Sequence, residues 1–279
     1  MKAVILTISA GGGHNTAAKA INECFSLLGI ETVTIDAYKY FNKYLSDVVE
    51  NGYLLSTKYV PKLYGKFYRM AEKKSDTDIK MKMGAFGTAL ILRKFARFIA
   101  SQNADVIIAT HIFAGELLTI LREKNTLDEN VKTIGIVTDF TVHPFWEETN
   151  LDYYVTASEL LEYQMTKKGI PKEKILPFGI PVHPKFSKKM SKSDARKILD
   201  IPDKDTVFVI AGSMGFGDVA RHIKKLDKSR HSFQIVAVCG NNKKLKAHLD
   251  KMNEKMERDM FVYGFVNNVD VIMDAADCI

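Results

Sequence analysis

A histidine directly behind three glycines is the feature of this sequence best suited to chemistry. Gly11, Gly12 and Gly13 follow an apolar run that ends at Ile8, and a helical pattern begins near His14. Glycines at a strand-to-helix turn let a ligand approach the backbone, and a helix N-terminus favours an anion or a polar oxygen. Histidine exchanges protons near neutral pH. The turn therefore predicts a ligand site, and His14 makes it a candidate catalytic site.

The same residues allow two other interpretations. The glycines could serve only to let the helix pack tightly on the strand, with His14 as an ordinary residue of the helix N-terminus. A dinucleotide site is the second alternative. Gly11 and Gly13 fit the fingerprint G-x-G-x-x-G, and Asp36 ends the next apolar run, where a ribose-binding acid would lie. The third glycine is replaced by Thr16, so this fingerprint is only half met.

Strands and helices alternate along the chain, which predicts an α/β fold with doubly wound parallel sheets. In the first half, we expect strands over 2–8, 31–36, 105–110, 132–138, 153–156 and 174–177. The helical patterns of that half cover 14–28, 40–56, 84–101, 112–124 and 158–168, and Gly29 and Gly169 fit helix C-terminal positions.

A proline- and glycine-containing stretch, 178–186, predicts a linker between a domain over 1–180 and a partial domain over 181–279. In the second domain we expect helices over 191–199, 243–257 and 268–275, and strands over 206–211, 233–238 and 260–263. The sequence ends at Ile279, where another strand would begin. We therefore expect that the second domain is incomplete.

A second glycine turn, Gly212 to Gly217, follows the first strand of the second domain. It lacks the lysine of a P-loop, so a nucleoside triphosphatase is disfavoured. Its backbone N–H groups are suited to a diphosphate without metal, and simple packing is the alternative. Ligands of open α/β sheets bind beyond the carboxyl ends of the strands. Two such domains would face each other across a cleft that holds a donor and an acceptor.

The bulk composition is that of a globular protein: 279 residues, 46% hydrophobic and 26% charged. No apolar run approaches the roughly 20 residues of a membrane span, and the chain enters its first strand without a signal peptide. Cys24, Cys239 and Cys278 lack the spacing of metal ligands and suit a reducing compartment. We expect a cytoplasmic protein.

The net charge of +7 is unevenly distributed. Residues 38–101 hold 13 Lys/Arg and 5 Asp/Glu, a balance of +8, and nine tyrosines and phenylalanines lie among residues 38–68. Lysines interleaved with aromatic rings suit an anionic membrane surface. Nucleic acid could also bind to this positive charge. The simplest alternative is a solvated helical face with no ligand. We favour the membrane, because the segment belongs to the domain of the first glycine turn, and expect no nucleic acid.

Several motifs, in this order, resemble the family of monogalactosyldiacylglycerol synthases and bacterial diacylglycerol glucosyltransferases, which is related to the transferase that makes lipid II. The resemblance covers nearly the whole chain. It is carried by Ile8 to His14, Thr138 to Trp146, Asp152 to Ser158, Gly179 to Val182, Gly212 to Gly215 and Cys239 to Asn241. It implies a GT-B fold and the inverting transfer of a hexose from UDP-glucose or UDP-galactose to diacylglycerol, with no metal and no other cofactor.

The resemblance also implies roles for particular residues. His14 would be the base that takes the proton of the acceptor hydroxyl. Acceptor-side residues would be Gly11, Gly12, Gly13, Asp139, His143 and Trp146, and donor-binding residues would be Gly212, Ser213, Met214, Gly215, Phe265 and Val266. The family's sugar-contacting Lys-Pro-Gly-Gly and Thr-x-x-Glu-Ala stretches would follow Ile279, so we expect weak donor binding by this chain alone.

Three hypotheses follow. The first is a transferase on the inner face of the cell membrane. The others are a soluble nucleotide-sugar enzyme of the epimerase type, and a binding module for a dinucleotide or a lipid. Within the first hypothesis, two side chains each have two possible roles. His111 lines the site or is a structural histidine, and Trp146 inserts into lipid or packs in the core.

Overall fold

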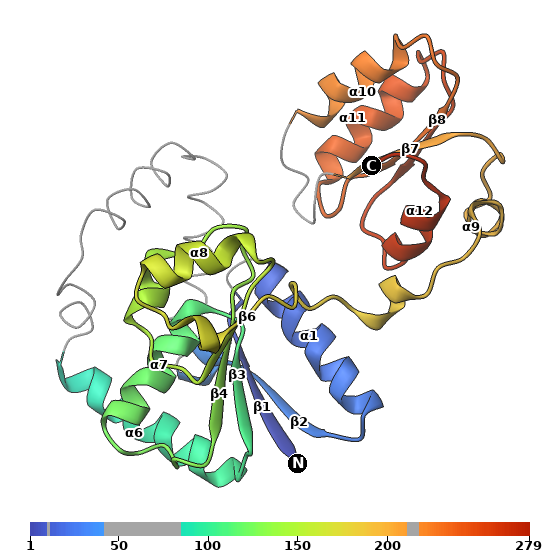
Figure 1. Ribbon diagram of the computed structural model, residues 1–279. Coiled ribbons are helices and arrows are strands. Elements are labelled where there is room, and N and C mark those ends of the chain that lie inside the picture. Colours follow the sequence, from blue (N-terminus) through green and yellow to red (C-terminus); the bar gives the residue numbers. More distant parts are fainter. Residues whose placement is uncertain (10–11, 42–84, 211–217) are drawn as a thin grey trace. The chain divides into compact units, whose positions relative to one another are not determined.

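The computed structural model describes residues 1–9, 12–41, 85–210 and 218–279 (Figure 1). The chain divides into two compact units, Met1–Pro184 and Lys185–Ile279. The division lies within the stretch 178–186 that the sequence marks as a linker. Each unit is a parallel sheet with helices on both faces, so the predicted α/β class is confirmed.

The sheet of the first unit has the strand order β2-β1-β3-β4-β5-β6, and all of its pairs are parallel. Its strands are β1 (Lys2–Thr7), β2 (Glu31–Asp36), β3 (Val106–Ala109), β4 (Lys132–Ile136), β5 (Tyr153–Val155) and β6 (Ile175–Leu176). The chain leaves β1 for β2 on one side and then returns to β3 on the other. The order therefore reverses between β1 and β3, where ligands of such sheets bind.

The helices of this unit are α1 (Gly12–Leu27), α2 (Ala37–Phe41), α6 (Ala85–Gln102), α7 (Ile112–Glu123) and α8 (Leu160–Lys167), with the short 3-10 helices η1 (Pro144–Glu148) and η2 (Lys172–Lys174). Successive residues of β1 point to opposite faces of the sheet. Ala3 and Ile5 pack with α1, whereas Val4 and Leu6 pack in the cluster that contains α6 and α7. The glycines expected to end helices, Gly29 and Gly169, do adopt positive φ, of 69° and 87°.

In the second unit, three parallel strands lie in the order β7-β8-β9. Its elements are η3 (Pro184–Ser187), which spans the boundary, α9 (Lys192–Ile198), β7 (Thr206–Ile210), α10 (Val219–Asp227), β8 (Gln234–Val238), α11 (Lys243–Asn253), β9 (Met260–Tyr263) and α12 (Val269–Ala275). Ile235 and Ala237 of β8 pack against α10 and α11, while Val236 and Val238 pack against α12. Both faces of β8 are thus covered.

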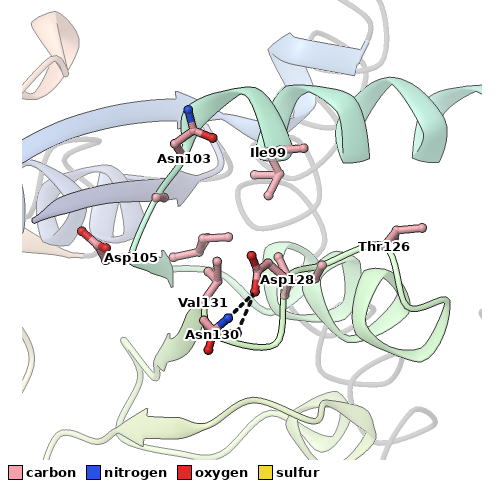
Figure 2. A pocket seen from close by; sticks show the side chains of 11 residues that line it. Ile99, Asn103, Asp105, Thr126, Asp128, Asn130 and Val131 are labelled. Carbon is pink, nitrogen blue, oxygen red and sulfur yellow. Dashed lines mark hydrogen bonds between the residues drawn. The ribbon is translucent and has the colours of Figure 1, made fainter.

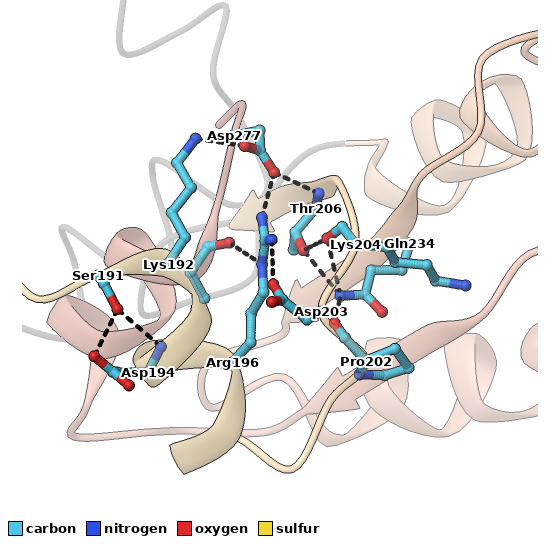
Figure 3. Close-up of polar contacts among 11 residues, drawn as sticks. Ser191, Lys192, Asp194, Arg196, Pro202, Asp203, Lys204, Thr206, Gln234 and Asp277 are labelled. Carbon is cyan, nitrogen blue, oxygen red and sulfur yellow. Dashed lines mark hydrogen bonds and ion pairs between the residues drawn. The ribbon is translucent and has the colours of Figure 1, made fainter.

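A buried arginine joins the start of this unit to its last residues (Figure 3). Arg196 of α9 binds the carbonyl of Ala275 at 3.1 Å, the carboxylate of Asp203 at 2.8 Å and that of Asp277 at 2.6 Å. Asp277 also accepts the N–H of Thr206 at 2.8 Å, and Cys278 forms a parallel bridge with Val207. The charge of the buried guanidinium is therefore fully paired.

The helix α10 and the 3-10 helices η1, η2 and η3 were not expected from the sequence. The helix α10 precedes β8 and has Val219 and Ile223 buried. The 3-10 helix η1 interrupts the loop after β4, where Pro144 and Trp146 are buried. The helix expected over 40–56 lies mostly outside the described residues, as does most of the basic aromatic segment.

Candidate active site

The reversal of strand order brings His14 to Thr110. His14 lies in the first turn of α1, just beyond the carboxyl end of β1, and Thr110 directly follows β3. These two strands are hydrogen-bonded neighbours in the sheet. Residues that are 96 positions apart in sequence therefore meet at one edge. The carboxyl ends of the strands form this edge, which is where ligands of open α/β sheets bind.

Two groups fix the imidazole of His14. Its Nδ1 lies 2.8 Å from the carbonyl oxygen of Thr110 and 2.9 Å from the hydroxyl of Thr138, beyond β4. A carbonyl oxygen can only accept a hydrogen bond, so Nδ1 carries the ring proton and donates it. Nε2 then has the lone pair, and it is the nitrogen that can accept a proton from a ligand.

Burial lowers the pKa of His14 below its ordinary value of 6.5. The bond to Thr110 and the carboxylate of Asp139 oppose that shift without cancelling it. The imidazole is therefore neutral at pH 7, which is the state that a general base requires. Asp139 itself is exposed and acts on His14 through its charge.

A second histidine, His111, lies against this imidazole, and a third, His143, acts on His111 through its charge; both cap helices. The ring of His111 meets that of His14 edge to face, with centroids 4.5 Å apart and planes at 79°. His111 caps α7 by accepting the N–H of Phe113, and His143 caps η1 by accepting the N–H of Phe145. Burial, then the charges of His14 and His143, lower the pKa of His111 to about 3. His111 is a helix cap that also contacts the candidate base.

The described glycines of the first turn are open to solvent. Gly12 and Gly13 are exposed, and Gly11 lies outside the described residues. A Cβ atom built at Gly13 would meet nothing within 4 Å, and the φ of Gly13 is not positive. Neither packing nor backbone conformation therefore demands glycine at position 13. This observation weakens the packing interpretation and leaves close approach of a ligand as the reason.

The only tryptophan of the chain is a core residue. Trp146 is 3% exposed and makes an edge-to-face contact with Tyr154. Its ring lies over two glycines, because a Cβ at Gly115 or Gly135 would come within 3.1 or 2.7 Å of it. Of the two possibilities left open, packing is the one observed. Trp146 fixes the loop that carries His143 and is too buried to insert into lipid.

Asp36, the acid of the dinucleotide alternative, has protein partners. It accepts the hydroxyl of Ser9 and the backbone N–H of Lys39. Ser9 in turn is bonded to Asn15, which accepts the hydroxyl of Thr7 at 2.8 Å. This chain of bonds joins the ends of β1 and β2 to α1. A structural role accounts for Asp36.

The residues expected to bind the donor are only partly described. Gly212, Ser213, Met214 and Gly215 lie outside the described residues. Phe265 follows the carboxyl end of β9 and is 60% exposed, whereas Val266 packs against the core of the second unit. Phe265 thus offers an uncovered aromatic ring at the ligand-binding edge of its sheet.

A pocket of about 470 Å³ lies at the opposite edge of the first sheet (Figure 2). Its lining includes Asn103 and Asp105, which precede β3, and Asp128 and Asn130, which precede β4. Asp128 accepts two hydrogen bonds from Asn130, and Asp105 accepts the N–H of Lys2. The pocket is therefore separate from His14, and its acids are already used as hydrogen-bond acceptors.

No sequence pattern singles out Glu116, a half-buried acid on α7. Burial, then the charge of Glu148, raises the pKa of Glu116 to about 7, and its Oε1 has no hydrogen-bond partner among the described residues. Within the described ranges, no three His, Cys, Asp or Glu side chains are grouped to hold a metal ion. No helix there is long and apolar enough to cross a bilayer.

Two solved structures have a similar fold over nearly the whole chain. Anabaena Alr3699/HepE, in complex with UDP and glucose, aligns over 99% of this chain and 72% of its own, with a TM-score of 0.58 and 13% identity. Acinetobacter baumannii MurG aligns over 99% and 72%, with a TM-score of 0.55 and 14% identity. The fold is that of the GT-B glycosyltransferases.

Sequence comparison gives the family. The profile described as "Monogalactosyldiacylglycerol (MGDG) synthase" matches residues 14–182, more than half of the chain. The chain belongs to this family. It is 27% identical to a processive diacylglycerol beta-glucosyltransferase of Bacillus mycoides (strain KBAB4) and 28% identical to one of Bacillus cereus (strain B4264). In each case the match covers 99% of this chain and 70% of the relative.

Proposed function

We propose that the protein transfers a hexose from a UDP-sugar to the hydroxyl of diacylglycerol, with inversion at the anomeric carbon and without a metal. Membership of the synthase family and the names of the Bacillus relatives support this acceptor. Those names also favour UDP-glucose over UDP-galactose. The observation that carries the proposal is the anchored, neutral imidazole of His14, whose Nε2 has a lone pair at the ligand-binding edge.

In the proposed reaction, Nε2 of His14 takes the proton of the acceptor hydroxyl as its oxygen bonds to the anomeric carbon. The bond from that carbon to the diphosphate breaks, and UDP leaves with the electron pair. His14 becomes an imidazolium, which the exposed carboxylate of Asp139 stabilises. On the donor side, we assign the diphosphate to the turn Gly212 to Gly215 and the uracil to Phe265 and Val266.

We further propose that the first unit works at an anionic membrane surface on the cytoplasmic side. Phe140, Leu160 and Tyr163, here called the apolar rim, are 77%, 83% and 72% exposed. The first lies next to Asp139, and the other two share a face of α8 with Lys167. The N–H of Val142 bonds to Gln164 of α8 at 3.4 Å, which joins the two parts. Apolar side chains with a nearby lysine suit lipid.

The test supplies diacylglycerol in anionic liposomes with UDP-glucose or UDP-galactose, and identifies the products by mass spectrometry. We expect a hexosyl-diacylglycerol and free UDP from one of the donors. Consumption of UDP-sugar without a lipid product would instead favour a soluble nucleotide-sugar enzyme. Liposome binding with no turnover of either donor would favour a lipid-binding module.

A further inference from the structure

Two adjacent residues, Thr110 and His111, both contact the candidate base His14. The carbonyl of Thr110 accepts the proton of His14 Nδ1 at 2.8 Å, and the ring of the next residue lies against the imidazole at 4.5 Å between centroids. One contact fixes a ring atom and the other limits rotation of the ring about its bond to Cβ. Together they hold the imidazole in a single orientation, with Nε2 opposite the anchor.

His111 is suited to this role because it is itself held in place. Its backbone is extended, with φ −141° and ψ 147°, and its Nδ1 accepts the N–H of Phe113 at 3.1 Å. The proton of the ring is therefore on Nε2, and the ring cannot turn over without losing the cap of α7. The position of the ring is fixed by a helix of the fold.

The charge state of His111 also fits. The groups that act on this pair are Asp139 beyond β4, which favours a proton on His14, and His143, which disfavours one on His111. His111 is half-buried, and its pKa of about 3 keeps it neutral throughout the physiological range. When His14 accepts a proton, its neighbour therefore adds no second positive charge.

We propose that His111 is a positioning residue for His14: its neutral ring keeps Nε2 of His14 in the orientation that receives the proton of the acceptor hydroxyl. This inference rests on the proposed function for its kinetic consequence only. The orientation and titration of His14 are measurable without any substrate.

Two variants separate positioning from helix capping. His111→Asn keeps a preferred N-cap acceptor for Phe113 and removes the ring. His111→Phe keeps a ring against His14 and removes the acceptor. Both are compared with the wild type for melting temperature, for kcat and KM with the liposome substrate, and for the titration of His14 by ¹⁵N and ¹³C NMR.

We expect His111→Asn to keep the melting temperature and the KM for the UDP-sugar. Its kcat should fall by about 10- to 100-fold, the range for a misplaced catalytic group. The pKa of His14 should rise toward 6.5, because water reaches the uncovered ring, so the acid limb of the pH profile moves to higher pH. His111→Phe should have a lower melting temperature but keep most of kcat and the wild-type titration of His14.

The proposal is overturned if His111→Asn keeps both the kcat and the His14 titration of the wild type, or if His111→Phe loses as much kcat as His111→Asn. The wild type provides a check that needs no variant. Its His14 must show the proton on Nδ1 and a pKa below 6.5, and a signal like that of a free imidazole contradicts the proposal. Failure of the wild type to glycosylate diacylglycerol would refute the proposed function and leave the NMR result standing.

Discussion

At the residue scale, the chemistry of His14 depends on groups that the sequence places far from it. The carbonyl of Thr110 decides which nitrogen carries the proton, and burial with the nearby Asp139 decides the pKa. A neutral imidazole is needed to accept a proton. Activity should therefore persist below pH 6.5 and be lost as the pH falls through the lowered pKa of His14.

The Asp139→Asn variant tests this electrostatic account. The carboxylate raises the pKa of His14, so its removal should lower that pKa further. The acid limb of the pH profile of kcat/KM is then expected to move to lower pH, opposite to the shift expected for His111→Asn. An unchanged limb would show that Asp139 does not act on the group that controls the reaction.

Gly13→Ala separates ligand approach from folding. A methyl group at this position meets nothing within 4 Å of the chain, and alanine favours a helix over glycine by about 0.5–1 kcal/mol. We expect equal or slightly higher stability to urea together with at least a tenfold loss of kcat/KM. Wild-type activity in this variant would argue that no ligand comes close to Gly13.

The candidate base could be predicted from sequence, but the residues that hold it could not. Glycines followed by a histidine at a strand-to-helix junction are visible in the linear chain. Thr110 acts through its backbone carbonyl, and any residue type has one. Its contact with His14 follows from the adjacency of β1 and β3, which single-residue patterns do not encode. The burial of Trp146 likewise depends on its contact with Gly115 of α7 and Gly135 of β4, which the linear sequence does not reveal.

At the scale of elements, η1 is fixed by the fit of one ring over two glycines. A Cβ at Gly135 would lie 2.7 Å from Cζ3 of Trp146, a distance that forces the ring to move. We expect Gly135→Ala to destabilise the protein by about 1–3 kcal/mol, the usual range for overpacking, as measured by urea unfolding. Gly13→Ala is the matched control, since its methyl group has open space. Equal stability of the two variants would contradict the packing described for Trp146.

The apolar rim provides a test of membrane contact. Replacement of Phe140, Leu160 and Tyr163 by serine should reduce sedimentation with anionic liposomes several-fold and leave the urea midpoint nearly unchanged, because all three side chains are exposed. Leu27 and Leu28 are each 72% exposed at the far end of α1, so their double serine variant is the control. Equal loss of binding in both variants would show that the rim has no special role.

Most helices and strands could be predicted from the sequence, because their apolar residues are strongly periodic or form a short continuous run. All the expected strands of both units are present, because each is a short apolar run between turn residues. The helix α10 went unpredicted although Val219, Ile223 and Leu226 have helical spacing, since basic residues dominate that segment. No periodic pattern marks η1, which is a single turn held by capping and by its buried tryptophan.

At the scale of the whole molecule, the two units share the same architecture. Each is a parallel α/β sheet, and in the sequence a glycine-rich stretch follows the first strand of each. Alternation of strands and helices predicts this class, and the proline-containing stretch predicts where the units divide. The order of strands in the sheet could not be predicted in this way, because it results from which strands pair in space. That order nevertheless brings the ends of β1 and β3 together at the candidate site.

The measurement that tests the central claim most directly compares the wild type with His14→Asn. The asparagine amide nitrogen takes the place of Nδ1 and can still donate to the carbonyl of Thr110, but it does not titrate near neutral pH. With diacylglycerol liposomes and the preferred UDP-hexose, we expect kcat to fall by at least about 100-fold, the range for loss of a general base. The KM for the UDP-sugar should stay nearly unchanged, and the residual activity should lack the acid limb. A variant with wild-type kcat and an intact acid limb would contradict the assignment of His14 as the base.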